Sequence, residues 1–166
     1  IKNLKNFKNL ILSHFRTIYL YEGIKNKRRL KYRNYKFFIF KKLKSIKDKN
    51  IIKFLNSEKK NRFKNNKSLL VLYYKKKIVT TGWMYQGSIW NVSEIEKKIN
   101  IKNKILLFDF FIFKEFRNQG NYSKILQLIK NLNTNKKFWI YCLSNNYSSK
   151  KGIENSSFSL IKTIRK

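Results

Sequence analysis

A strand, a short turn and a helix follow one another without a break between Ile105 and Leu132. The run ILLFDFFIF is apolar and aromatic and is long enough for one buried strand, and the polar turn KEFRNQGNYS follows it directly. Beyond the turn, apolar residues recur at helical spacing in YSKILQLIKNL. The free N–H groups of such a helix point into the preceding turn, where the helix dipole favours an anion. Because Gly120 lets the backbone approach a ligand closely, the stretch predicts a phosphate-binding turn.

The residues of this turn resemble a known motif. RNQGNY, from Arg117 to Tyr122, is similar to the pyrophosphate-binding motif of the GNAT superfamily of N-acetyltransferases, which reads Arg or Gln, two residues, Gly, one residue, then Gly or Ala. Tyr122 departs from the last position, but Tyr-Ser occurs there in one branch of the superfamily. That branch, which the aspartate in FDFF and the pair Arg62-Phe63 also resemble, contains acetyltransferases encoded with bacterial surface-polysaccharide enzymes.

A second stretch resembles the late motif of the same superfamily. It comprises Asn146 and Ser149, then the pair Ile153-Glu154, then the pair Ser157-Phe158, at the spacing of that motif. Ser157 replaces the usual glycine, and Ile153 stands where many members carry the tyrosine that protonates the departing thiolate. With both motifs, the resemblance covers the chain from about Leu69 to Phe158.

The resemblance implies a fold and a cofactor. The fold is α/β, with a mixed, mostly antiparallel central sheet flanked by helices, and the cofactor is acetyl-CoA. The pantetheine arm would pair with the backbone of Phe110 and Ile112, and Asn146 and Ser149 would contact its end. The pyrophosphate would lie on the turn, whose expected binding residues are Arg117, Asn118, Gln119, Gly120, Asn121, Tyr122 and Ser123.

The implied reaction transfers an acetyl group to the amine of a small molecule, such as an amino sugar. Asp109 is the candidate general base, because an aspartate buried in an apolar strand beside the cofactor would favour proton uptake. The alternative is that Asp109 pairs with a lysine or arginine and only fixes the sheet. Since Ile153 cannot protonate the thiolate, Tyr147 is the candidate acid, with Tyr122 as the other possibility.

The net charge of +32 has two interpretations. One is a nucleic-acid or anionic-membrane binder. The other is nucleotide bias, because Lys, Asn, Ile, Phe and Tyr dominate and Pro is absent, as expected from a very AT-rich genome. The lysines are spread along the whole chain, which favours the second. Two alternatives to an acetyltransferase stay open: a basic nucleic-acid-binding module, and a catalytically degenerate GNAT-fold protein that binds coenzyme A.

The sequence predicts one compact domain over 35–166, preceded by a basic amphipathic helix and linker over 1–34. The helix is expected over 4–21, packed on the domain or, alternatively, on an anionic membrane. No run reaches transmembrane length and no signal peptide is evident, which indicates a cytoplasmic protein, or one peripheral to the inner face of the membrane. His14 has no second histidine with which to build a metal site, and Cys142 excludes an internal disulfide because it has no partner.

The remaining elements follow from periodicity and turn residues. Strands are expected over 35–40, 68–74, 78–85, 138–143 and 158–164, with a hairpin around Lys75-Lys76-Lys77. Helices are expected over 45–61, capped by Ser45, and over 147–155. The segment 86–104, which holds Glu94 and Glu96, is the least readable and is expected to be a short helix or loop over the substrate site.

Overall fold

The computed structural model describes residues 16–166. Within this part of the chain, a seven-stranded sheet has the order β2-β3-β4-β7-β8-β1-β9, and β5 and β6 form a separate two-stranded hairpin. The strands are β1 (Thr17–Gly23), β2 (Tyr35–Phe40), β3 (Lys67–Tyr74), β4 (Lys77–Tyr85), β5 (Ile89–Val92), β6 (Lys97–Asn100), β7 (Lys104–Ile112), β8 (Lys137–Leu143) and β9 (Ser159–Arg165). The helices are α2 (Lys49–Phe54), α3 (Ser57–Asn61), α4 (Asn121–Ile129) and α5 (Tyr147–Glu154), with short 3₁₀ turns η1 (Leu43–Ser45), η2 (Arg62–Lys64) and η3 (Lys114–Phe116).

Neighbouring strands of the large sheet are antiparallel except for β7 and β8, which are parallel. This arrangement confirms the predicted mixed, mostly antiparallel sheet flanked by helices. The parallel pair needs a crossover connection, and α4 supplies it. The strand–turn–helix stretch on which the sequence analysis rests is therefore β7, η3 and α4, at the centre of the molecule.

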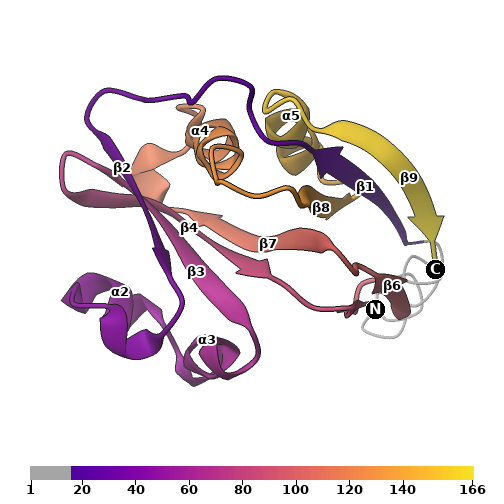
Figure 1. The fold of residues 1–166 in the computed structure, drawn as a ribbon, viewed down its shortest axis with the longest axis horizontal. Coiled ribbons are helices and arrows are strands. Elements are labelled where there is room, and N and C mark those ends of the chain that lie inside the picture. Colours follow the sequence, from indigo (N-terminus) through magenta and orange to yellow (C-terminus); the bar gives the residue numbers. More distant parts are fainter. Residues whose placement is uncertain (1–15) are drawn as a thin grey trace, which may run out of the picture.

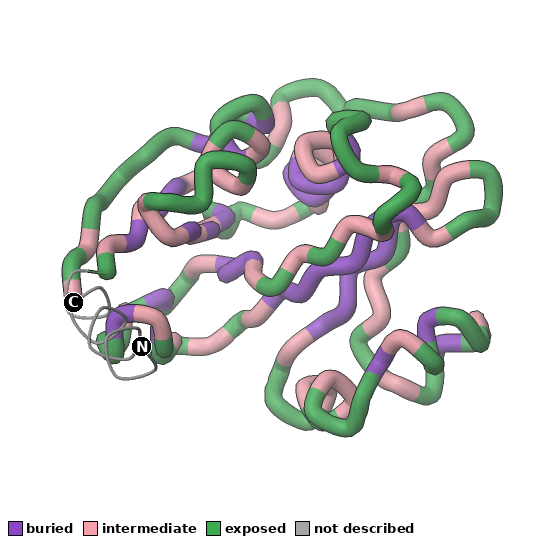
Figure 2. The backbone as a smooth tube through the Cα atoms, turned by 180° about the vertical axis from the view of Figure 1, so that it is seen from behind, coloured by how far each residue is buried: buried purple, intermediate pink, exposed green. Residues whose placement is uncertain are grey.

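The helices cover opposite faces of the sheet (Figure 1). On one face, Ile125, Leu126 and Ile129 of α4 and Ile153 of α5 are buried against β3, β7 and β8. On the other face, Ile51 of α2 is buried in a second cluster with Leu69, Val71 and Trp83. Alternate residues of β3 thus face different clusters, as expected for a central strand buried on both sides. Figure 2 shows this burial along the central strands and α4, whereas β9 is exposed.

The structure corrects the predicted helix over 4–21 at its end. Thr17–Gly23 is strand β1, which pairs with β8 on one side and with β9 on the other. Ile18 and Leu20 are buried on alternate positions, and the β-branched and aromatic residues of TIYLY fit a pleated surface. The rest of the predicted helix, residues 4–15 with His14 among them, lies outside the described residues.

Two further segments differ from expectation. The helix predicted over 45–61 is two short helices, capped by the side chains of Asp48 and Asn56, while the Ser45 hydroxyl donates to the carbonyl of Lys42 instead. The segment 86–104 contains the β5–β6 hairpin rather than a helix or plain loop. The strands predicted over 35–40, 68–74, 78–85, 138–143 and 158–164 and the helix predicted over 147–155 are all confirmed within two residues. Among the described residues, no helix is long and apolar enough to cross a membrane.

Candidate active site

The candidate site begins where β7 and β8 part. The two strands pair only from Lys104 to Leu107 and from Lys137 to Ile140, although β7 continues to Ile112 and β8 to Leu143. Backbone groups of β7 beyond Leu107 that face β8 are therefore not used by this ladder. An extended ligand can pair with such groups in the way an added strand does.

A β-bulge lies in β7 at the start of this gap. Asp109 and Phe110 together stand opposite the single residue Gly82 of β4. Asp109 has a φ of 48°, a left-handed conformation that aspartate tolerates better than most residues. The extra residue bends β7 and redirects the side chains that follow it.

The turn between β7 and α4 forms a concave backbone surface. Asn118 and Gly120 both have left-handed φ values, 59° and 68°. The first hydrogen bond inside α4 runs from the Lys124 N–H to the Gly120 carbonyl at 3.0 Å, so the N–H groups just before Lys124 have no intrahelical partner. Successive N–H groups at such a turn, together with the positive end of the helix dipole, favour a bound anion.

Side chains of the turn hold it in place and leave the backbone for a ligand. Asn121 is 1% exposed; its Oδ1 accepts from the Tyr35 hydroxyl at 2.9 Å, and its Nδ2 donates to the Phe116 carbonyl at 2.8 Å. The Ser123 hydroxyl donates to the Gly152 carbonyl at 3.0 Å, which ties α4 to α5. Arg117 Nε donates to the Ile112 carbonyl at 3.2 Å, so the predicted phosphate-binding arginine also spans the end of β7.

A cavity of about 780 Å³ joins the turn to the gap between β7 and β8. It brings together Asp109 and nearly all of the predicted cofactor-binding residues, which are Phe110, Ile112, Arg117, Asn118, Gly120, Asn121, Tyr122, Ser123, Asn146 and Ser149. Gln119 and Tyr147 are not among the residues that line it. Tyr147 is 77% exposed, so the structure does not place this candidate acid at the cavity.

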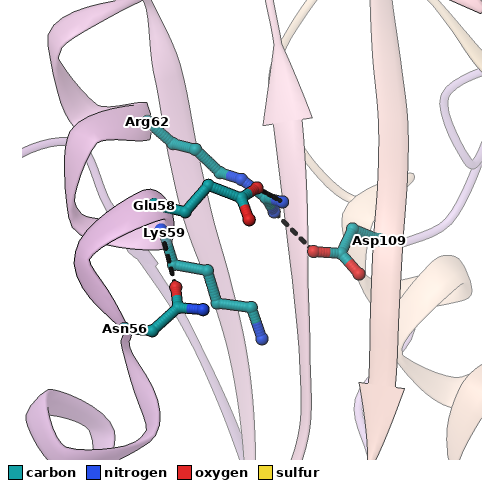
Figure 3. A network of polar contacts seen from close by, with 5 residues as sticks. All are labelled: Asn56, Glu58, Lys59, Arg62 and Asp109. Atoms are coloured by element: carbon teal, nitrogen blue, oxygen red, sulfur yellow. Dashed lines mark hydrogen bonds and ion pairs between the residues drawn. The ribbon is translucent and has the colours of Figure 1, made fainter. Parts of the chain in front are cut away.

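Asp109 is not buried in an apolar environment, which corrects the premise on which it was chosen. Its side chain is 40% exposed, lines the cavity and forms an ion pair with Arg62. Figure 3 shows the Arg62 guanidinium between Asp109 and Glu58. Arg62 Nη2 lies 2.8 Å from Glu58 Oε1. Burial of Arg62 works to lower its pKa, but the two carboxylates outweigh this and raise the pKa.

The late motif serves structure more directly than the resemblance implies. Asn146 caps α5, because its side-chain oxygen accepts from the Ser149 N–H at 3.1 Å. Ile153 is fully buried in the core. Ser157 has a φ of 58°, a left-handed conformation that costs less for glycine, which is the usual residue at this point of the motif.

Tyr122, the departure in the first motif, packs across the gap. Its ring lies 5.3 Å from that of Phe110, centroid to centroid. A Cβ atom on Gly152 would lie 2.4 Å from the Tyr122 ring, and a Cβ on Gly82 would lie 2.4 Å from the Phe110 ring. Two rings therefore fill the space between two glycines, one in β4 and one in α5. We call these four residues, Gly82, Phe110, Tyr122 and Gly152, the ring cluster.

The structure adds residues to the site that the sequence analysis did not select. Glu94 and Tyr141 line the cavity, and the Trp90 indole N–H donates to the Tyr141 hydroxyl at 3.2 Å. The scarcity of acids was the one sequence signal pointing to Glu94, because only eight Asp and Glu residues occur among 166. Nothing in the sequence places Glu94 beside Tyr141, because the contact depends on how the β5–β6 hairpin folds back.

Comparison with known proteins supports the fold. No protein-family model and no curated protein matches the chain. Solved structures do match. A conserved protein of unknown function from Staphylococcus epidermidis matches with a TM-score of 0.59 and 13% identity, over 96% of this chain and 63% of that one. A GNAT-family acetyltransferase from Colwellia psychrerythraea matches with a TM-score of 0.57 and 14% identity, over 96% of this chain and 59% of that one. A protein from Novosphingobium aromaticivorans that is assigned as a GNAT-family acetyltransferase also matches. Its TM-score is 0.56 and its identity 7%, over 90% of this chain and 61% of that one. The chain thus spans less than two thirds of the length of each of these proteins. Its described part has the fold found in acetyltransferases of the GNAT family.

Proposed function

We propose that this chain is an acetyl-CoA-dependent N-acetyltransferase that acts on the amine of a small molecule. The observation that carries the proposal is the continuous cavity from the N-terminal turn of α4 into the gap between β7 and β8. An anion-binding turn at one end and unpaired strand backbone at the other suit a ligand with a pyrophosphate and an extended amide arm. The GNAT fold agrees with this interpretation.

The residues present fit acetyl-CoA. The N–H groups from Asn118 to Ser123 would hold the pyrophosphate, with Arg117 adding positive charge. The backbone of Phe110 and Ile112 would pair with the pantetheine arm. When bound, acetyl-CoA supplies an acetyl group activated as a thioester. A backbone N–H of β7 can hold the oxyanion that develops on the carbonyl oxygen.

The acceptor is proposed to be a small amine, and an amino sugar is the example that the sequence suggests. That suggestion rests on the resemblance of the motifs to acetyltransferases associated with surface polysaccharides. Tyr147 lies outside the cavity lining, so we give it no part in the reaction. Tyr122 lines the cavity, and its proposed place is beside the cofactor. Burial, and after it the nearby Cys142, raises the pKa of its phenol, which makes it a weak acid.

Calorimetry with acetyl-CoA tests the proposal. Gly120→Glu should weaken binding by about tenfold or more, because it places a negative charge against the pyrophosphate. Gly120→Lys is the matched control: a Cβ at this position would meet only Lys124 Nζ, at 3.8 Å, and the strain of the positive φ is shared by both variants. If both variants melt like the parent and bind acetyl-CoA equally well, the pyrophosphate does not lie on this turn.

Salt and turnover separate the rival functions. Because the chain carries a net charge of +32, the titration needs moderate salt and a comparison with citrate, an anion without a pyrophosphate. Saturable acetyl-CoA binding with acetyl transfer to an amine supports the proposal. Binding without transfer to any amine would favour a degenerate coenzyme A-binding protein, and only salt-sensitive binding to nucleic acid would favour the nucleic-acid-binding module.

A further inference from the structure

The part of the cavity on the face of the sheet away from α4 and α5 is lined by acidic residues. Along β8, Ile140 and Cys142 point into the core under those helices, whereas Tyr141 packs on the opposite face with Ile18, Val92 and Ile95. Asp109 also turns to this opposite face, where it meets Arg62 near α3. Two of the eight acids of the chain, Asp109 and Glu94, line the cavity.

The two acids differ in their partners. Arg62 neutralises Asp109. No ion pair of Glu94 is found in the part of the chain that the structure describes. Within residues 16–166, Glu94 therefore contributes a negative charge that no ion pair neutralises.

Glu94 is joined to Tyr141 by a hydrogen bond. The Tyr141 hydroxyl donates to Glu94 Oε2 at 3.4 Å and accepts from the Trp90 indole N–H at 3.2 Å. A phenol oxygen has two lone pairs, so one remains for a further donor. Burial, reinforced by the charges of Glu94 and Asp109, raises the pKa of Tyr141 to about 12, which keeps the phenol protonated at neutral pH.

The β5–β6 hairpin positions this pair. Val92 and Ile95, on either side of Glu94, are buried. Trp90 packs against Phe108 of β7 with the two rings tilted and their centroids 4.6 Å apart. The Ser93 hydroxyl also donates to Glu94 Oε2, at 3.2 Å. The turn that carries Glu94 is thus fixed against the gap by packing on both sides.

We propose that Glu94 and Tyr141 form the acceptor subsite, which binds a primary ammonium compound and takes its proton. The inference rests on the proposed acetyltransferase function. The ammonium group donates to the Tyr141 oxygen while the phenol proton moves to Glu94, which leaves a neutral amine. The amine nitrogen then bonds to the acetyl carbon as the carbon–sulfur bond breaks. The nitrogen then loses a second proton, which ends on the departing sulfur to give the thiol of coenzyme A. The proton held by Glu94 passes to water.

The charge of the whole chain restricts the places where a cation can bind. A net charge of +32 disfavours cations over most of the molecular surface. An ammonium compound should therefore bind saturably only where carboxylate charge is left unbalanced. A primary alkylamine, which is cationic at neutral pH, fits this requirement better than a neutral or anionic acceptor.

Binding of n-butylammonium chloride to the protein saturated with coenzyme A tests the inference without turnover. We expect NMR titration to show saturable binding that weakens roughly tenfold in Glu94→Gln, because the hydrogen-bonded charge is lost. Glu96→Gln removes the same charge from the same hairpin, where Glu96 pairs with Lys166, and should bind like the parent. No saturable binding in the parent, or equal affinity in the two variants, would overturn the inference.

Turnover supplies a second readout. With acetyl-CoA and an alkylamine, Tyr141→Phe should lower kcat by about a hundredfold. It should weaken butylammonium binding less than Glu94→Gln does, because the hydrogen bond to the phenol is lost but the Glu94 charge remains. A Tyr141→Phe protein with the parent's kcat would remove the phenol from the proton path. Acetyl-CoA calorimetry on the same samples separates the two hypotheses. A parent that does not bind acetyl-CoA refutes the proposed function, whereas one that binds acetyl-CoA but no ammonium refutes only the acceptor subsite.

Discussion

Asp109 shows how one side chain can meet several structural demands at once. It adopts a left-handed backbone conformation in the bulge, pairs with Arg62 and lines the cavity. Asparagine tolerates the same backbone conformation, whereas most residues do not. Asp109→Asn therefore removes the charge and keeps the bulge, which makes it a cleaner variant than Asp109→Ala.

We expect Asp109→Asn to lower the free energy of unfolding slightly and to leave turnover within about threefold. Because Asp109 is 40% exposed, solvent screening reduces the value of its ion pair to about 1 kcal/mol or less. Urea unfolding, acetyl-CoA calorimetry and initial rates on one sample check this. A loss of a hundredfold in rate, with stability and cofactor affinity unchanged and the low-pH limb of the rate profile abolished, would instead make Asp109 the general base.

The residues of the site differ in how far the sequence could predict them. The shape of the turn before α4 could be predicted because it is local: one glycine between a strand and a helix fixes both the left-handed conformation and the free N–H groups. That the turn binds a phosphate stays a prediction. The exposure of Asp109 could not, because it depends on a bulge whose partner, Gly82, lies 27 residues earlier in the chain. Glu94 and Tyr141 meet only through the fold of the hairpin.

At the scale of elements, β1 holds an unusual place for the first described strand. It lies between β8 and β9, so the N-terminal part of the described chain closes the sheet beside its C-terminal strand. Glu22 fastens this contact: its carboxylate accepts from Lys137 Nζ at 2.7 Å and from the Trp139 indole N–H at 2.9 Å, both on β8. Burial works to raise the pKa of Glu22, but these two hydrogen bonds, with the charges of Lys137 and Lys104, outweigh it and lower the pKa below its usual value of 4.5.

Glu22→Gln should destabilise the protein by about 2 kcal/mol at pH 7. Because the pKa of Glu22 is lower in the folded chain than in the unfolded one, its contribution is complete above pH 4.5. The contribution is lost as the pH falls through the folded pKa, so the difference between parent and variant should shrink in acid. Urea unfolding at several pH values measures this. A difference that does not change with pH would show that the Glu22 charge does not hold β1 to β8, and Glu96→Gln serves as the surface control.

The elements themselves were predictable to different degrees. Apolar runs such as those of β3, β7 and β8 indicate buried strands because they are short and rich in aromatic and β-branched residues. The sequence TIYLY of β1 fits a helix and a strand about equally, and the helical pattern preceding it favoured the wrong one. Only its position between β8 and β9 settles the choice, and that position is a tertiary property.

At the scale of the whole molecule, the charge of +32 predicts weak attraction to any polyanion. We expect binding to DNA and RNA that does not depend on sequence and falls by roughly a thousandfold or more between 50 and 200 mM salt. Filter binding or anisotropy with unrelated oligonucleotides checks this. A complex that is specific for one sequence and persists at high salt would favour the nucleic-acid-binding module instead.

The ring cluster joins the sheet to the helices that cover it. Gly82 and Phe110 lie on β4 and β7, and Tyr122 and Gly152 lie on α4 and α5. The ring cluster acts as a spacer whose thickness is set by two aromatic rings. Positions 122 and 152 are consequently not independent. A small residue at 122, as in the usual motif, would leave room for a larger one at 152, whereas tyrosine at 122 demands glycine there. The tyrosine that departs from the first motif is thus accommodated by a glycine 30 residues further along the chain.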